Sequence, residues 1–193
     1  MPERIVNLVI LAEDLRSARF LRQYAARRIV HPRAIETRIC HSGSAEQFVR
    51  NSFPDEVKKQ RWCVRGQIKK AALLVHVDAD TGTVAAEHQL LAKALNDAGE
   101  LGRTASERIA VVVPKYSIET WIHGLSEVSV DEDYDYKRDR QGRIGSRRDE
   151  LCDKRIPHAA KALLDLTRPH AAAPPASMPA LVPAVGELRR LEQ

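Results

Sequence analysis

Four short runs of mostly apolar residues, separated by segments with helical character, constrain the fold of this chain more than any other feature. The runs span residues 5–12, 35–42, 71–77 and 108–114. Three of them are nearly continuous in apolar, largely β-branched side chains, which is typical of strands covered on both faces. The run at 35–42 alternates between apolar and polar residues, as a half-exposed strand does. The four runs therefore predict four strands of one layered domain.

The segments between these runs predict helices. Apolar periodicity or capping residues indicate helices over residues 13–29, 44–53, 83–98 and 117–125. Strands that alternate with helices imply βαβ units, right-handed crossovers and a mostly parallel sheet between helices. The predicted fold class is therefore α/β, with a four-stranded central sheet flanked by helices.

The chain divides into three parts. Its 193 residues are near the size of a single domain, and we expect residues 1–128 to form the α/β core. Residues 129–148 form an insert in which acidic residues are followed by arginines and two glycines, so we expect a charged loop. Residues 149–193 form a C-terminal helical extension, with a Pro/Ala-rich linker before a last short helix.

Composition excludes several classes of protein. Hydrophobic residues make up 44% of the chain and charged residues 30%, which is typical of a soluble globular domain. No run approaches the roughly 20 apolar residues of a membrane span, and the first residues lack the pattern of a signal peptide. We therefore expect a cytoplasmic protein without a membrane partner. Three widely spaced cysteines give neither a disulfide framework nor a paired-cysteine zinc site.

Acidic residues follow three of the predicted strands. They are Glu13, the pair Asp78 and Asp80, and Glu119 at the start of the helix after the last strand. Ligands of a parallel sheet gather at the carboxyl ends of its strands, and carboxylates that converge there need a compensating cation. Oxygen ligands of this kind suit Mg²⁺ or Mn²⁺. On an extended strand Asp78 and Asp80 would share a face; alternatively, Asp80 is only the N-cap of the next helix.

The order of these acids resembles the TOPRIM domain of topoisomerases, bacterial primases and OLD-type nucleases. The matching segments are LVILAED with Glu13 and LLVHVDADTGT with Asp78 and Asp80. The segment VVVPKYSIETWIHGL, with Glu119 and Trp121, is similar to an element of the small RloB-type proteins of mobile elements and phage defence. The chain departs from the family pattern where Asp14 follows Glu13 in place of glycine, and where Thr-Gly-Thr replaces a third acid.

The resemblance implies a Rossmann-like TOPRIM fold and metal-dependent cleavage of a phosphodiester bond in DNA or RNA. It implies that Asp78, Asp80, Glu13 and Glu119 hold Mg²⁺ or Mn²⁺, and that Glu13 is a metal ligand or the general acid/base. Lys115, just after the last strand, is a candidate for pairing with phosphate charge, or else a solvated lysine at a strand end. The resemblance also implies a place in anti-phage defence.

The charged insert is the candidate nucleic-acid contact. Its arginines are Arg138, Arg140, Arg143, Arg147 and Arg148. A flexible cationic arm follows a phosphate backbone and gives salt-sensitive binding, and the net charge of +5 is compatible with a polyanionic partner. The alternative is an ordinary solvated loop.

Two other functions remain open from the sequence. One is a non-catalytic TOPRIM-like module that binds nucleic acid or is an accessory subunit of a larger complex, so a protein partner or a homo-oligomer is possible. The other is a phosphohydrolase of the haloacid dehalogenase type, whose D-x-D-x-T/V motif is matched imperfectly because Gly82 stands where threonine or valine belongs. A phosphohydrolase of this type would also give Glu13 no role.

Overall fold

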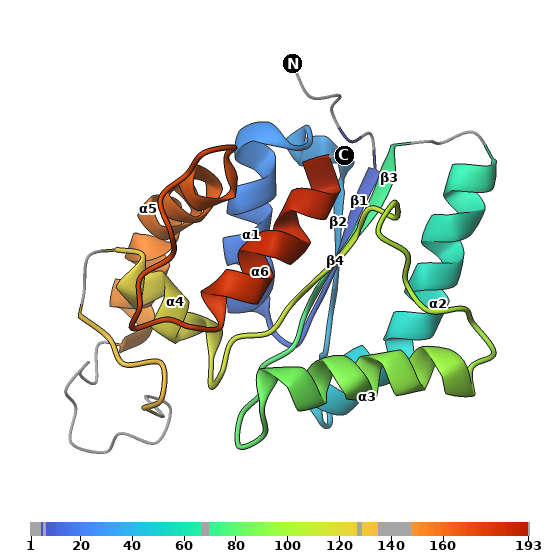
Figure 1. Cartoon of the computed structure of the whole chain (residues 1–193), viewed down its shortest axis with the longest axis horizontal. Helices are drawn as coiled ribbons and strands as arrows, with labels where there is room; N and C mark the ends of the chain where they lie inside the picture. Colours follow the sequence, from blue (N-terminus) through green and yellow to red (C-terminus); the bar gives the residue numbers. More distant parts are fainter. Residues whose placement is uncertain (1–4, 6, 67–69, 127–128, 135–147, 193) are drawn as a thin grey trace.

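The four predicted strands form one parallel sheet. Figure 1 shows the computed structural model of the chain, which describes residues 5, 7–66, 70–126, 129–134 and 148–192. The strands run in the order β2-β1-β3-β4, and every neighbouring pair is parallel. Their bounds are β1 Asn7–Ala12, β2 Ile35–Ile39, β3 Ala71–His76 and β4 Ile109–Val112. The predicted α/β class with a four-stranded sheet is confirmed, and the arrangement is Rossmann-like.

Helices cover both faces of this sheet. Their bounds are α1 Leu15–Arg28, α2 Ala45–Arg65, α3 Val84–Asp97, α4 Ile118–Gly124, α5 Arg148–Thr167 and α6 Leu181–Arg189, with short 3₁₀ turns at Pro32–Ala34 and Arg190–Glu192. Helices α1, α4, α5 and α6 lie on one side of the sheet, and α2 and α3 lie on the other (Figure 1). None of the helices in the described ranges is long and apolar enough to cross a membrane.

The alternation of side chains along the strands explains the two layers of core. In β1, Leu8 and Ile10 point into the core on the α1 side, while Leu11 points into the core under α2 and α3. Successive side chains of a strand point to opposite faces, so one apolar strand supplies both cores. This is why the runs at 5–12 and 71–77 are apolar apart from Asn7 and His76.

Helix α2 is longer than the sequence indicated. Ser44 caps it as expected, because its side chain accepts a hydrogen bond from the backbone N–H of Gln47, but the helix continues past Phe53 to Arg65. Its buried stripe carries on through Val57 and Gln60, so packing against the sheet outweighs the missing backbone N–H of Pro54. The basic stretch that follows Asp55 is therefore the second half of α2 as far as Arg65.

The C-terminal extension packs onto the same core as the sheet. Buried residues of α5 and α6, among them Leu163 and Leu188, belong to one cluster with Leu8 and Ile10 of β1. Helix α6 also covers the outer edge of β4, where Glu187 Oε2 accepts a hydrogen bond from the backbone N–H of Val111 at 2.9 Å. The unpaired donor of an edge strand thus finds a partner inside the chain.

Candidate functional site

The carboxyl ends of β1 and β3 are the candidate ligand position in this topology. From β1 the chain continues to β2 on one side of the sheet, whereas β3 leads to β4 on the other side. The order of the strands therefore reverses between the neighbouring strands β1 and β3. In open α/β sheets, ligands bind outside the carboxyl ends of the strands at such a switch point. Glu13 follows β1 and Asp78 follows β3, so these two acids lie at this switch point.

Glu13 and Asp78 lie side by side. Glu13 Oε1 accepts a hydrogen bond from the backbone N–H of Asp78 at 3.2 Å, and the two residues are only 7% and 2% exposed. Two buried carboxylates at one sheet edge repel each other unless positive charge or hydrogen-bond donors compensate them. Glu13 and Asp78 are therefore the candidate acids of this edge for a cation or a proton.

His76 contacts this pair and was not among the predicted site residues. It is fully buried at the end of β3, and its Nε2 lies 3.3 Å from Asp78 Oδ1. Burial lowers the pKa of His76, but the hydrogen bond to Asp78 and the charges of Asp78, Glu13 and Asp14 together raise it above 6.5. The spacing of two residues on a strand places both side chains on one face, which is the signal that could have found it.

Asp80 differs from Glu13 and Asp78 in its exposure and in its backbone conformation. It is exposed and has a positive φ of 47°, in a turn that the hydrogen bond from Gly82 N to Ala79 O closes at 2.8 Å. Aspartate tolerates the left-handed region better than most residues. Asp80 is therefore not on an extended strand, and the expectation that it shares a strand face with Asp78 is wrong. It is not the N-cap of α3 either, because the side chain of Thr83 accepts from Ala86 N.

Asp14 takes the capping role at the other strand end. Its side chain accepts a hydrogen bond from Ser17 N at 2.8 Å and so caps α1. The neighbour of Glu13, where the family pattern has glycine, thus holds the start of the helix. This leaves Glu13 as the acid that faces β3.

Glu119 is held by an arginine from α1. Arg16 Nη1 donates to Glu119 Oε1 at 2.8 Å, and Arg16 Nε donates to Asp153 Oδ1 of α5 at 3.3 Å. The Glu119 side chain is 12% exposed, so this ion pair is largely shielded from water. Arg16 therefore sets the direction of Glu119, and no local pattern in the sequence announces this contact.

Lys115 forms an ion pair with Asp133 in the first part of the charged insert. Its ammonium group also lies 5.9 Å from the centre of the Tyr116 ring. The hydrogen bond from Lys115 to Asp133 raises the pKa of Lys115. Lys115 is thus fully charged, and its ammonium group is paired with the carboxylate of Asp133.

Trp121 anchors the insert to the core. The indole is fully buried, and its Nε1 donates to Glu132, whose other oxygen accepts from the backbone N–H of Ala180 at 2.7 Å. Burial raises the pKa of Glu132, although both hydrogen bonds oppose this effect. Residues 129–134 are therefore fixed to α4 and to the start of α6.

The remaining predicted contacts are not assembled into a further site. Within the described ranges, no three histidine, cysteine, aspartate or glutamate side chains form a group that could hold a metal ion. The arginines Arg138, Arg140, Arg143 and Arg147 lie outside the described residues, as does the side chain of Arg148. The four-carboxylate metal site and the cationic arm both stay predictions.

Comparisons with protein-family models, with curated proteins and with solved structures find no match to this chain.

Proposed function

We propose that this chain is a metal-dependent nuclease of the TOPRIM type, which cleaves phosphodiester bonds in nucleic acid. The observation that carries the proposal is the hydrogen-bonded pair of Glu13 and Asp78 at the switch point of the sheet. Two buried acids that meet at the ligand-binding edge of a parallel sheet are costly to the fold unless they serve a ligand.

The pair fits a hard divalent cation. Mg²⁺ is commonly bound by one or two protein carboxylates and completes its coordination with water and substrate phosphate. Glu13 and Asp78 would hold Mg²⁺ or Mn²⁺, with Asp80 and Glu119 as the further acids of the same edge. When bound, the cation polarises the phosphoryl oxygens and stabilises the leaving oxygen.

The other side chains of the edge would orient the acids and the substrate. His76 holds Asp78 in place through its contact of 3.3 Å, and Arg16 directs Glu119. Lys115 would pair with a phosphate of the substrate once Asp133 releases it, because a lysine ammonium is a point charge that suits phosphate. Glu13 would be a ligand or the general acid/base.

A non-catalytic nucleic-acid-binding module is the second candidate. It is favoured by the lack of a group of three ligating side chains among the residues that the structure describes. Such a module would act as an accessory subunit of a larger complex, and on the family resemblance either form would belong to phage defence.

One experiment separates the two candidates. The purified chain is incubated with supercoiled plasmid, linear DNA and structured RNA, in the presence of Mg²⁺, Mn²⁺ or EDTA. Glu13→Gln and Asp78→Asn are the test variants. Asp97→Asn is the matched control, because Asp97 is an exposed acid of α3 that pairs with Lys93.

A nuclease cleaves at least one substrate with Mg²⁺ or Mn²⁺, stops in EDTA, and loses activity in both test variants but not in the control. Binding without cleavage under every condition would favour the non-catalytic module. Cleavage that persists in Asp78→Asn would contradict the proposed site.

A further inference from the structure

A cavity of about 770 Å³ opens at the end of the sheet opposite to Glu13 and Asp78. The C-terminal half of α2 forms one wall, and the connection from α3 to β4 forms the other. Ala71 and Arg108, which start β3 and precede β4, line its inner end. The volume falls within the range of about 300–1,000 Å³ that is usual for ligand sites.

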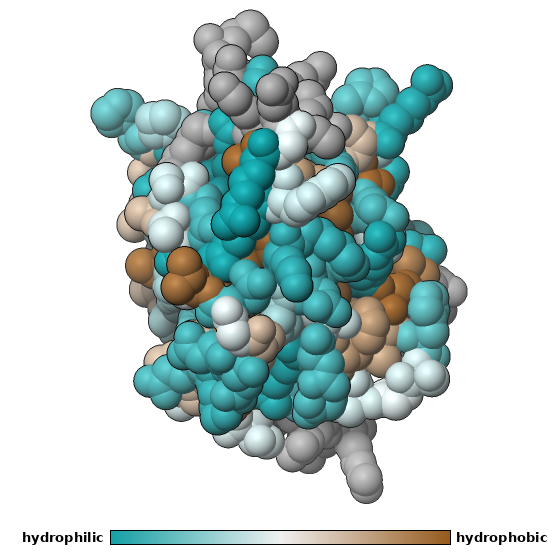
Figure 2. All heavy atoms as spheres, turned by 90° about the vertical axis from the view of Figure 1, so that its right-hand side faces the viewer, coloured by the Kyte–Doolittle hydropathy of each residue, from teal (hydrophilic) through white to brown (hydrophobic). Residues whose placement is uncertain are grey.

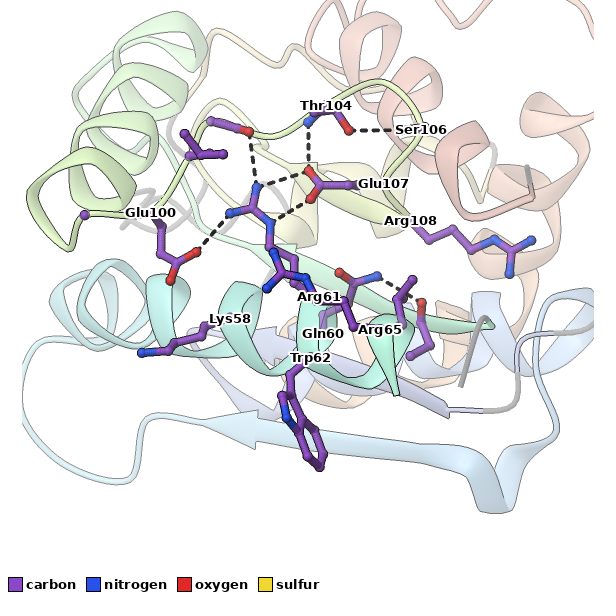
Figure 3. Close-up of a pocket in the computed structure, with 15 residues that line it drawn as sticks. Lys58, Gln60, Arg61, Trp62, Arg65, Glu100, Thr104, Ser106, Glu107 and Arg108 are labelled. Atoms are coloured by element: carbon purple, nitrogen blue, oxygen red, sulfur yellow. Dashed lines mark hydrogen bonds and ion pairs between the residues drawn. The ribbon is translucent and has the colours of Figure 1, made fainter. Parts of the chain in front are cut away.

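The walls of this cavity are held rigidly by one arginine. Figure 3 shows that Arg61 reaches from α2 to the carboxylates of Glu100 and Glu107. Its Nε donates to Glu107 at 2.6 Å, its Nη1 to Glu100 at 3.0 Å and its Nη2 to the carbonyl oxygen of Gly102 at 3.1 Å. These bonds keep the connection from α3 to β4 in place and compensate part of the negative charge of the two acids.

Trp62 is exposed at the rim. Its side chain is oriented away from Arg61 in Figure 3, and the residue is 72% exposed. It also borders a second hollow of about 230 Å³ between α2 and the sheet. The exposed indole therefore offers a flat aromatic face beside two hollows.

Two cations lie on the same face of α2 as this indole. Lys58 precedes Trp62 by four positions and Arg65 follows it by three, which are the spacings of neighbours on a helix surface. Both line the cavity and are exposed. Neither forms an ion pair with any residue in the described part of the chain, so their charge is available to an anion.

Exposed apolar side chains also lie at this cavity, because Val64 and Leu101 line it together with Trp62. Figure 2, which views the molecule from the side of α2 and α3, shows a mainly hydrophilic surface with hydrophobic residues in separate spots. A polyanion is the partner that this face suits, because two exposed cations, Lys58 and Arg65, lie beside an exposed aromatic ring.

We propose that Trp62, Lys58 and Arg65 form a binding site for single-stranded nucleic acid. An unpaired base stacks on the Trp62 indole, and its flanking phosphates contact Lys58 and Arg65. A duplex presents the same phosphates but hides its base faces, so the site selects unpaired segments. The choice of nucleic acid as the partner rests on the proposed function, whereas binding at this site requires no cleavage.

The two tryptophans of the chain make the test direct. Trp121 is fully buried and Trp62 is exposed, so quenching of intrinsic fluorescence by an added oligothymidine reports on Trp62. Titrations are made in EDTA, where cleavage cannot occur, with a DNA duplex and polyglutamate for comparison. Fluorescence anisotropy of a labelled oligothymidine then gives affinities for variants that lack Trp62.

The expected result is quenching by oligothymidine and little quenching by the duplex or polyglutamate. Trp62→Ala weakens binding by roughly tenfold or more, while Trp62→Phe keeps most of it. Lys58→Gln and Arg65→Gln each reduce the slope of log affinity against log salt by about 0.7. Lys161→Gln, which removes the same charge from α5 on the other side of the sheet, leaves affinity near that of the wild type.

Three results would overturn the proposal. They are unchanged affinity in Trp62→Ala, equally tight binding of the duplex with the same quenching, and a dimer in sedimentation that Trp62→Ala dissociates. Because the titrations contain no metal ion, binding that persists while the chain proves inactive as a nuclease would contradict only the proposed function.

Discussion

Glu13 accepts a hydrogen bond from the backbone N–H of Asp78, although 65 positions separate the two residues in the sequence. The bond joins the carboxyl ends of β1 and β3 and brings both acids to one point. It also gives Glu13 two separable properties, because its oxygen satisfies a buried donor and its charge can serve a cation.

These two properties can be measured apart. Glu13→Ala leaves the N–H of Asp78 buried without this acceptor, which costs about 1–3 kcal/mol of unfolding free energy. Glu13→Gln keeps a carbonyl oxygen and should cost less. Urea denaturation compares the stabilities, and both variants should lose metal-dependent cleavage. A Glu13→Gln variant that cleaves normally would rule out a role for the charge.

Asp14 is predicted to matter for stability alone. Asp14→Ala removes the N-cap of α1 and should lower the free energy of unfolding by about 1 kcal/mol. Asp14→Ser retains an oxygen that accepts from Ser17 N and should be close to the wild type. Chemical denaturation measures both. A loss of cleavage in Asp14→Ser, with normal stability, would show that this acid belongs to the site.

The ion pair of Lys115 and Asp133 is expected to restrain the lysine. Lys115→Gln should lower the rate of cleavage because it removes a phosphate contact, whereas Asp133→Asn should leave the rate unchanged or raise it by releasing the ammonium group. Initial rates over a range of substrate concentrations give the comparison. Equal losses of rate in the two variants would instead indicate that the pair is needed intact.

Glu132 should impose a pH dependence on stability. Burial raises its pKa above 4.5 in the folded chain, so from pH 4.5 up to that raised value the folded state binds more protons than the unfolded state. The free energy of unfolding therefore falls as pH rises through this window. Thermal denaturation of the wild type and Glu132→Gln from pH 4.5 upward should show a difference that changes with pH; a constant difference would contradict this assignment.

The strands were predictable because each carries its own signal. The apolar runs at 71–77 and 108–114 contain β3 and β4, since a strand covered on both faces has no polar side to interrupt it. Helix α2 was cut short at Phe53 because Pro54 and the polar residues beyond it weaken the apolar periodicity. Its buried stripe includes Gln60, whose side chain donates to the carbonyl oxygen of Ala71. The apolar periodicity of the sequence cannot indicate that such a polar residue is buried.

The candidate site was predictable only in part. Parallel strands bring their carboxyl ends to one edge, and this rule alone was enough to expect Glu13 near Asp78. The contact between Arg16 and Glu119 spans 103 positions, and a side-chain pair at that separation leaves no local spacing to recognise. The bend at Asp80 was missed for a similar reason, because a D-x-D segment reads as extended until the turn to Gly82 is known.

The hydrogen bond from Val111 N to Glu187 has a consequence for the order in which the molecule is built. Synthesis on the ribosome completes β4 long before it reaches α6, so the nascent chain exposes an edge with an unpaired donor until the last helix arrives. During that interval the edge is open to strands of other nascent chains. Docking of α6 ends this exposure, so the edge of β4 is covered only after α6 has been synthesised.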